Sequence, residues 1–173
     1  MHDCLWRSLL PRADKLIPLI LIVTGMATSP ALAKGVGSPA RLKEKDFVVI
    51  GLQADMTQND VRKILGDPQR TRMRTYHLET DAELLEWSYP DLVVSFGGGP
   101  SIFGVLITGP RYATRRGLRV GDTSDHVLAL YGTPEDRYKE GWYYRAPEDD
   151  LRVIRVEVRQ GKVSSIYVGW LVD

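Results

Sequence analysis

Arginine occupies every second position in the stretch RTRMR, residues 70–74. If this stretch is extended, Arg70, Arg72 and Arg74 point to one side as a basic stripe. Guanidinium groups bind carboxylates and phosphates through paired hydrogen bonds, so the stripe is a candidate patch for docking a protein, an anionic lipid surface or an envelope polymer. Three further arginines could join it: Arg111, Arg115 and Arg116. The alternative is a solvated loop balanced by three acidic residues: Glu79, Asp81 and Glu83.

A second candidate surface follows from the stretch LRVIRVEV, residues 151–158, where the side chains alternate between two faces. One face would carry Ile154, Val156 and Val158, and we expect it to pack on helices. The other would carry Val153, Arg155 and Glu157, and we expect it to face water or a partner. With two exposed aromatic candidates, the predicted partner-binding residues of this surface are Arg155, Glu157, Tyr167 and Tyr143.

Catalytic and metal-binding patterns are scarce. His77 and His126 are not part of an HxxxH or HExxH pattern, and we interpret them as surface or capping residues. The stretch GGGP (97–100) lacks the following Lys-Ser/Thr of a phosphate loop, and PEDD (147–150) lacks the alternating ligands of a calcium loop, so both are interpreted as turns. We therefore predict no enzymatic activity, no cofactor and no metal site.

The composition is typical of a globular protein that folds in water, with 43% hydrophobic and 26% charged residues in 173. The formal net charge is +1, so no global field attracts nucleic acid, and nucleic-acid binding is not expected. No apolar run reaches the length of about 18 residues that a membrane-spanning helix needs. These properties indicate a folded globular module whose function depends on local surface features and not on its overall charge.

Residues 1–33 are expected to be a signal peptide. The apolar core LIPLILIV (16–23) follows a positively charged region, and Ala-Leu-Ala (31–33) matches a signal-peptidase site. We expect cleavage after Ala33, giving a soluble periplasmic or extracellular chain without a transmembrane span; an uncleaved anchor helix is the alternative. Cleavage would remove Cys4, the single cysteine, so the mature chain would have no thiol and no disulfide.

The rest of the chain divides into a flexible leader (34–45) and two similar segments (46–110 and 111–173). The stretch GLQADMTQNDVRKILGDP (51–68) is echoed by GLRVGDTSDHVLALYGTP (117–134). In each, a Thr begins a short helix and a Gly-x-Pro ends it, which predicts a helix over 58–65 and another between Thr123 and Gly132. Val61 and Val127 should face the core. Helices of two turns need a sheet to cover.

Three strands are expected after each helix. The first set falls at 84–90, 91–96 and 102–108, and the second at 141–145, 151–158 and 163–170. This predicts an α+β fold of two helix-strand-strand-strand repeats, with one antiparallel sheet and short helices packed on one face. Four large aromatic residues on these strands are either core or interface residues: Trp87, Tyr89, Trp142 and Tyr144.

The duplicated pattern GL-x4-T-x3-V-x4-G-x-P, followed by an aromatic strand, resembles the SmpA/OmlA (BamE-like) domain and the tandem form of that fold in beta-lactamase inhibitor proteins. In the first segment the resemblance is carried by Gly51, Thr57, Val61, Gly66, Pro68 and Trp87. In the second it is carried by Gly117, Thr123, Val127, Gly132, Pro134 and Trp142. The resemblance implies a small exported protein that binds other proteins through an open sheet surface.

The functional prediction is therefore an exported, non-enzymatic interaction module of the cell envelope, with an unidentified envelope or extracellular protein as its partner. Two alternatives are a binder of envelope polymers or anionic lipid surfaces that uses the arginine patch, and a secreted enzyme inhibitor. The chain lacks both the lipidated cysteine of the assembly lipoproteins in this family and the cysteine pairs of its secreted inhibitors.

Overall fold

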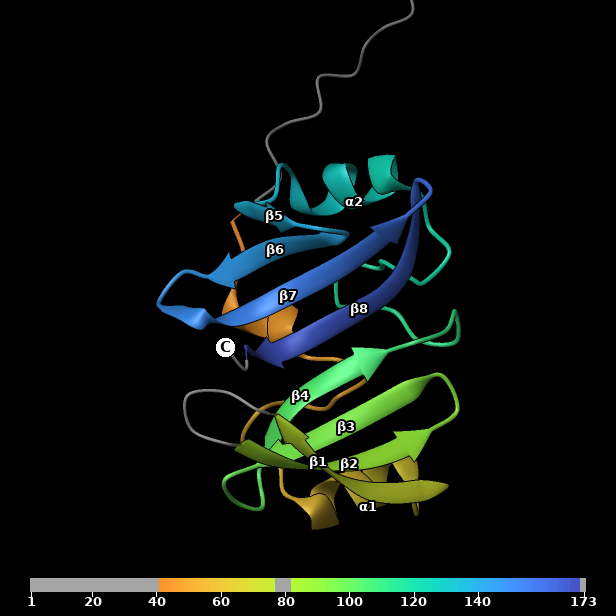
Figure 1. Ribbon diagram of the computed structural model, residues 1–173, viewed down its shortest axis with the longest axis vertical. Helices are drawn as coiled ribbons and strands as arrows, with labels where there is room; N and C mark the ends of the chain where they lie inside the picture. Colours follow the sequence, from red (N-terminus) through yellow and green to blue (C-terminus); the bar gives the residue numbers. More distant parts are fainter. Residues whose placement is uncertain (1–40, 77–81, 172–173) are drawn as a thin grey trace, which may run out of the picture. The chain divides into compact units, whose positions relative to one another are not determined.

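An antiparallel sheet of eight strands and two short α-helices form the part of the chain that the computed structural model describes, residues 41–76 and 82–171 (Figure 1). The fold class is α+β, as predicted. The expected signal peptide and most of the expected leader lie outside the described residues. Within these residues, no helix is long and apolar enough to cross a membrane.

Helix α1 (Gln58–Leu65) has the bounds that the sequence predicts. The Asp60 carboxylate reaches back to the start of the helix, where it accepts hydrogen bonds from the backbone N–H (3.1 Å) and the hydroxyl (2.7 Å) of Thr57. Gly66 follows the helix with φ of 76°, a left-handed value that glycine adopts without steric cost. The capping residues therefore fix both ends of a helix too short to be stable alone.

Helix α2 (Ser124–Tyr131) is built on the same plan. The Thr123 hydroxyl accepts a hydrogen bond from the backbone N–H of His126 at 3.2 Å, and Gly132 ends the helix with φ of 81°. A sheet tyrosine then contacts each helix end: Tyr89 donates to the carbonyl of Gly66 and Tyr144 to that of Gly132, both at 3.1 Å. The two helices are thus attached to the sheet by equivalent hydrogen bonds.

Four strands follow each helix. After α1 come β1 (Arg70–Tyr76), β2 (Ala82–Tyr89), β3 (Leu92–Gly97) and β4 (Ile102–Ile107). After α2 come β5 (Asp136–Tyr138), β6 (Gly141–Ala146), β7 (Asp149–Arg159) and β8 (Lys162–Trp170). Their order in the sheet is β1-β2-β3-β4-β8-β7-β6-β5, so the two sets meet at a β4–β8 seam (Figure 1).

The prediction of three strands per segment was wrong, because β1 and β5 each add a strand before the first predicted one. Every residue of β1 from Arg70 to Thr75 is exposed, as are all three of β5, so neither strand has the apolar alternation by which strands are recognised. They are strands because they pair with β2 and β6.

The hydrophobic core lies against one face of the sheet. Val61 and Val127 from the helices are fully buried there. They join buried side chains that alternate along the strands: Leu92, Val94, Phe96, Val105, Ile107, Ile154, Val156, Ile166 and Val168. Of the four large aromatic residues, Trp87, Tyr89 and Tyr144 are buried in this core and Trp142 packs against it, so they are core residues.

Structure begins before residue 46, where the sequence predicted the flexible leader to end. A 3-10 helix, η1 (Glu44–Phe47), follows Leu42, and both Leu42 and Phe47 are buried in the core. The buried Asp46 carboxylate is 2.7 Å from a guanidinium nitrogen of Arg116. Apolar burial and this ion pair hold the segment in place. The Gly-, Pro- and Lys-rich composition of residues 34–45 gave no sign of this.

Candidate functional site

The face of the sheet opposite the core carries a continuous row of side chains across all eight strands. The pairing registers place the row in this order: Arg70, Ser88, Val93, Leu106, Tyr167, Arg155, Tyr143 and Asp136. Parallel rows beside it hold Arg72, Arg74 and Glu157. We call this surface the open face. All seven predicted partner-binding residues lie on it, although the sequence assigned them to two separate surfaces.

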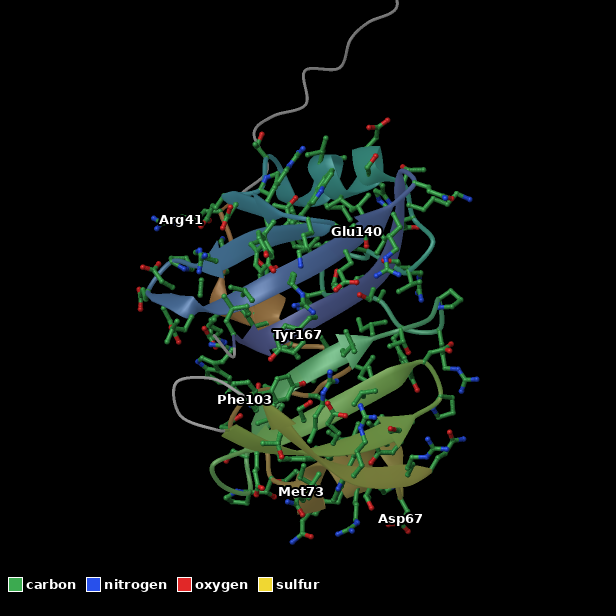
Figure 2. The ribbon with its side chains drawn as sticks, in the orientation of Figure 1. Arg41, Asp67, Met73, Phe103, Glu140 and Tyr167 are labelled. Carbon is green, nitrogen blue, oxygen red and sulfur yellow. The ribbon has the colours of Figure 1, made fainter. Side chains whose placement is uncertain are left out.

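Tyr167 lies over the β4–β8 seam (Figure 2). One of the four residue pairs at the seam consists of two glycines, Gly104 and Gly169, and the tyrosine ring occupies the space that a side chain at Gly104 would need. Its hydroxyl donates a 2.6 Å hydrogen bond to the carbonyl of Trp170, and burial raises the pKa of Tyr167 well above its ordinary value. Tyr167 is therefore a fixed, half-buried aromatic residue, not the exposed one that was predicted.

The stripe on β1 is held by a carboxylate from the neighbouring strand. Glu86 has a side chain only 6% exposed, and its carboxylate lies 2.7 Å from Arg72 and 3.5 Å from Arg74. The hydroxyl of Tyr76 donates to the same carboxylate at 3.4 Å. Of the acidic residues expected to balance the stripe, Glu79 and Asp81 lie outside the described residues. Glu86 was not among the predicted site residues, although its alternation with the core residue Trp87 indicates that it lies on the open face.

Arg155 is held less firmly than Arg72. One guanidinium nitrogen is 3.4 Å from Glu157, a carboxylate that also lies 3.7 Å from Arg159. The guanidinium carbon of Arg155 is 5.6 Å from the centre of the Tyr167 ring. Its buried Nε–H has no hydrogen-bond partner among residues 41–76 and 82–171. An unpaired buried donor costs about 1–3 kcal/mol.

Two hollows of about 260 Å³ each adjoin at Arg155. The first has an apolar floor of Leu84, Val93 and Leu106, with a polar and aromatic rim that includes Arg74, Tyr76, Glu86, Tyr167 and Trp170. The second is lined by Tyr138, Lys139, Glu140, Gly141, Tyr143, Glu157 and Arg159. Of the seven predicted residues, Arg70 and Arg72 line neither hollow.

The three additional arginines do not extend the stripe. Arg116 is 15% exposed; it pairs with Asp46 and donates to the carbonyl of Leu130 at 2.9 Å, so it has a structural role. Arg115 is beside it, in a hollow lined by η1 and α2. Arg111 is exposed in the connection before α2. The prediction of one combined arginine patch was therefore wrong, because Arg115 and Arg116 line a hollow away from the open face.

His126 takes no part in the open face. His126 lies in the first turn of α2, where its Nδ1 is 3.1 Å from the Asp122 carboxylate and its side chain is 47% exposed. His77 lies outside the described residues. In the described part of the chain, no three His, Cys, Asp or Glu side chains gather as a group that could hold a metal ion.

Together, these observations define an α+β protein with one buried and one open sheet face. No family model matches the chain, and no curated protein matches it. Among solved structures it is similar to the uncharacterized protein YfeY from Escherichia coli, with a TM-score of 0.49 and 12% sequence identity. The alignment covers 75% of this chain and 99% of that one.

Proposed function

We propose that this chain is an exported, non-enzymatic module that binds a protein partner through the open face. The observation that carries the proposal is the arrangement of all seven predicted residues on this face, five of them lining two adjoining hollows. Tyrosine and arginine are the residue types enriched at the energetic centres of protein interfaces. The partner is expected to be an envelope or extracellular protein.

The residues at the centre of the open face are suited to contact at low entropic cost. Tyr167 is held by its hydrogen bond to Trp170 and by packing on Gly104, so little side-chain freedom remains to be lost on binding. Val93 and Leu106 are half-buried beside it, which adds apolar area. Fixed aromatic and apolar side chains surrounded by charged residues are typical of a protein-binding surface.

A duplicated unit, as in the tandem SmpA/OmlA-like fold, is part of this proposal. Its support is the set of equivalent contacts in the two segments. Each segment has a tyrosine hydrogen bond to the glycine that ends its α-helix, Gly66 or Gly132. Each also has a backbone hydrogen bond from a strand to the residue two positions before the helix: the Ile102 N–H donates to the Met56 carbonyl before α1, and the Val163 N–H donates to the Asp122 carbonyl before α2. The strand order is also symmetric about the β4–β8 seam.

Export is the other part of the proposal, and its support is the pattern of residues 1–33. Cell fractionation followed by amino-terminal sequencing tests it directly. The expected result is an exported chain that begins at Lys34. A chain that retains residues 1–33 and stays with the cytoplasm would refute the export proposal.

Photo-crosslinking in the native cell tests the binding face. A photoreactive phenylalanine analogue replaces Ser88 or Tyr143, both on the open face, and in a matched control it replaces Ile64, which is 44% exposed on α1. The expected result is a protein adduct at the two open-face positions and none at Ile64.

Adducts of equal yield at all three positions, or none at the open-face positions, would overturn the proposal. Adducts at Ser88 and Tyr143 that contain lipid or envelope polymer instead of protein would favour the alternative of an anionic-surface binder. A partner enzyme that loses its activity in the complex would identify the chain as an inhibitor.

A further inference from the structure

We infer that the partner presents an extended acidic segment to the open face, with a carboxylate at Arg155 and, two residues along the segment, an apolar side chain in the first hollow. This inference rests on the proposed protein-binding function and adds the chemistry of the partner. It concerns the two hollows that share Arg155, the first between β1 and β8 and the second over β6 and β7.

The charge around the hollows favours an anionic occupant. In two separate ion-pair groups beside the hollows, four arginines share three glutamates: Arg72 and Arg74 with Glu86, and Arg155 and Arg159 with Glu157 and Glu140. Lys139 adds a further positive charge to the second hollow. A surface with net positive charge and closely spaced guanidinium groups attracts carboxylates, and the paired hydrogen bonds of these groups orient them.

Arg155 is the guanidinium shared by the linings of both hollows. Arg72 has two nitrogens 2.7 Å from one oxygen of Glu86, whereas Arg155 has one contact of 3.4 Å to a carboxylate that Arg159 shares. The side chain of Arg155 is 32% exposed. A carboxylate from the partner would pair with this partly exposed guanidinium group and balance the local charge.

The first hollow is also suited to an apolar side chain. Its floor is formed by Leu84, Val93 and Leu106, and the stacked pairs Arg74–Tyr76 and Arg155–Tyr167 line it. A volume of about 260 Å³ lies below the range of roughly 300–1,000 Å³ that whole small-molecule ligands occupy. It fits a single side chain, and the second hollow beyond Arg155 continues the path for the rest of the segment.

Two peptides of equal length test the inference with the mature chain: acetyl-Leu-Ala-Glu-Ala-Leu-amide, in which the glutamate and the leucines share one side of an extended segment, and the same peptide with glutamine in place of glutamate. Binding is followed by NMR through the methyl groups of Leu84 and Leu106 and the Nε–H signal of Arg155. We expect the glutamate peptide to bind about tenfold more tightly, as a charge-assisted hydrogen bond provides, and to shift all three signals.

The variants Arg155→Gln and Arg74→Gln should reduce this preference to less than about threefold. The control Arg111→Gln removes the same charge from an exposed loop and should leave it unchanged. A failure of both peptides to bind, equal binding of the two, or an unchanged preference in both open-face variants overturns the inference. Arg155-dependent binding to phosphatidylglycerol vesicles without a glutamate preference also overturns it, in favour of a lipid surface.

The two proposals can fail separately. If photo-crosslinking identifies a protein on the open face and the peptides show no glutamate preference, only the acidic segment is wrong. If no protein is crosslinked at Ser88 or Tyr143, the binding function itself is wrong, whatever the peptides do.

Discussion

Replacing Gly104 with alanine should destabilise the fold through a collision with Tyr167. A Cβ at this position would lie 2.6 Å from Cε2 and Cζ of the tyrosine ring, well inside van der Waals contact. The ring cannot move away without weakening its 2.6 Å hydrogen bond to the Trp170 carbonyl. Overpacking of this kind costs about 1–3 kcal/mol. A domain of this size loses roughly 3–5 °C of Tm per kcal/mol, so a fall of about 3–15 °C is expected.

Calorimetry on a double-mutant cycle isolates the effect. In a Tyr167→Ala background the space above Gly104 is empty, so Gly104→Ala should cost less than about 0.5 kcal/mol. Gly99→Ala is the matched control, since a Cβ there meets no atom within 4 Å. The reasoning is refuted if Gly104→Ala has the same effect with and without the tyrosine, or no effect in either background.

Three further predictions concern the helix ends and the buried ion pair. Tyr89→Phe and Tyr144→Phe should each reduce the free energy of unfolding by about 0.5–1.5 kcal/mol in urea titrations, because each variant loses one hydrogen bond to the glycine that ends a helix. Unequal losses would contradict the equivalence of the two contacts. Burial disfavours the charged Asp46, but hydrogen bonds from Arg116 and from the Lys43 N–H hold its pKa below the ordinary 3.8. The ionised carboxylate of Asp46 therefore stabilises the fold above pH 3.8, and this stabilisation is lost as the pH falls through the lower folded pKa. Asp46→Asn should reduce the free energy of unfolding by about 3–5 kcal/mol and abolish that pH dependence in thermal melts. Hydrogen bonds from the neighbouring lysine and threonine lower the pKa of Asp60 to about 2, so an NMR titration midpoint near 4 would be evidence against the capping contact.

The helices could be predicted from the sequence because their limits depend on local chemistry. Thr57 and Gly66 set the bounds of α1 within one short stretch, and the same holds for α2. Strand faces were also predictable where apolar and charged residues alternate, as around Arg155. The edge strands β1 and β5 were missed because their residues are exposed and polar, and only pairing with a neighbouring strand makes them extended.

The composition of the site could be predicted better than its geometry. Alternation placed Arg155 on the exposed side of its strand and would place Arg70, Arg72 and Arg74 together if their stretch were extended, but nothing local indicated that the two groups belong to one face. The half-burial of Tyr167 depends on Gly104, which is 63 positions away in the sequence and reaches it through the β4–β8 pairing. The engagement of Arg72 by Glu86 is likewise a cross-strand contact. The geometry of the site thus depends on contacts between segments that are distant in the sequence, and local sequence patterns do not indicate such contacts.

The β4–β8 seam has a consequence for how the chain folds. Six of the seven strand pairings connect strands that are consecutive in the chain, whereas the seam joins Gly104 to Gly169. Hairpins close short loops within microseconds, but a distant pairing must first overcome a larger loss of chain entropy. The seam should therefore form last, and its closure should set the refolding rate. Until then the unpaired edges of β4 and β8 are the segments most exposed to misassociation with another chain.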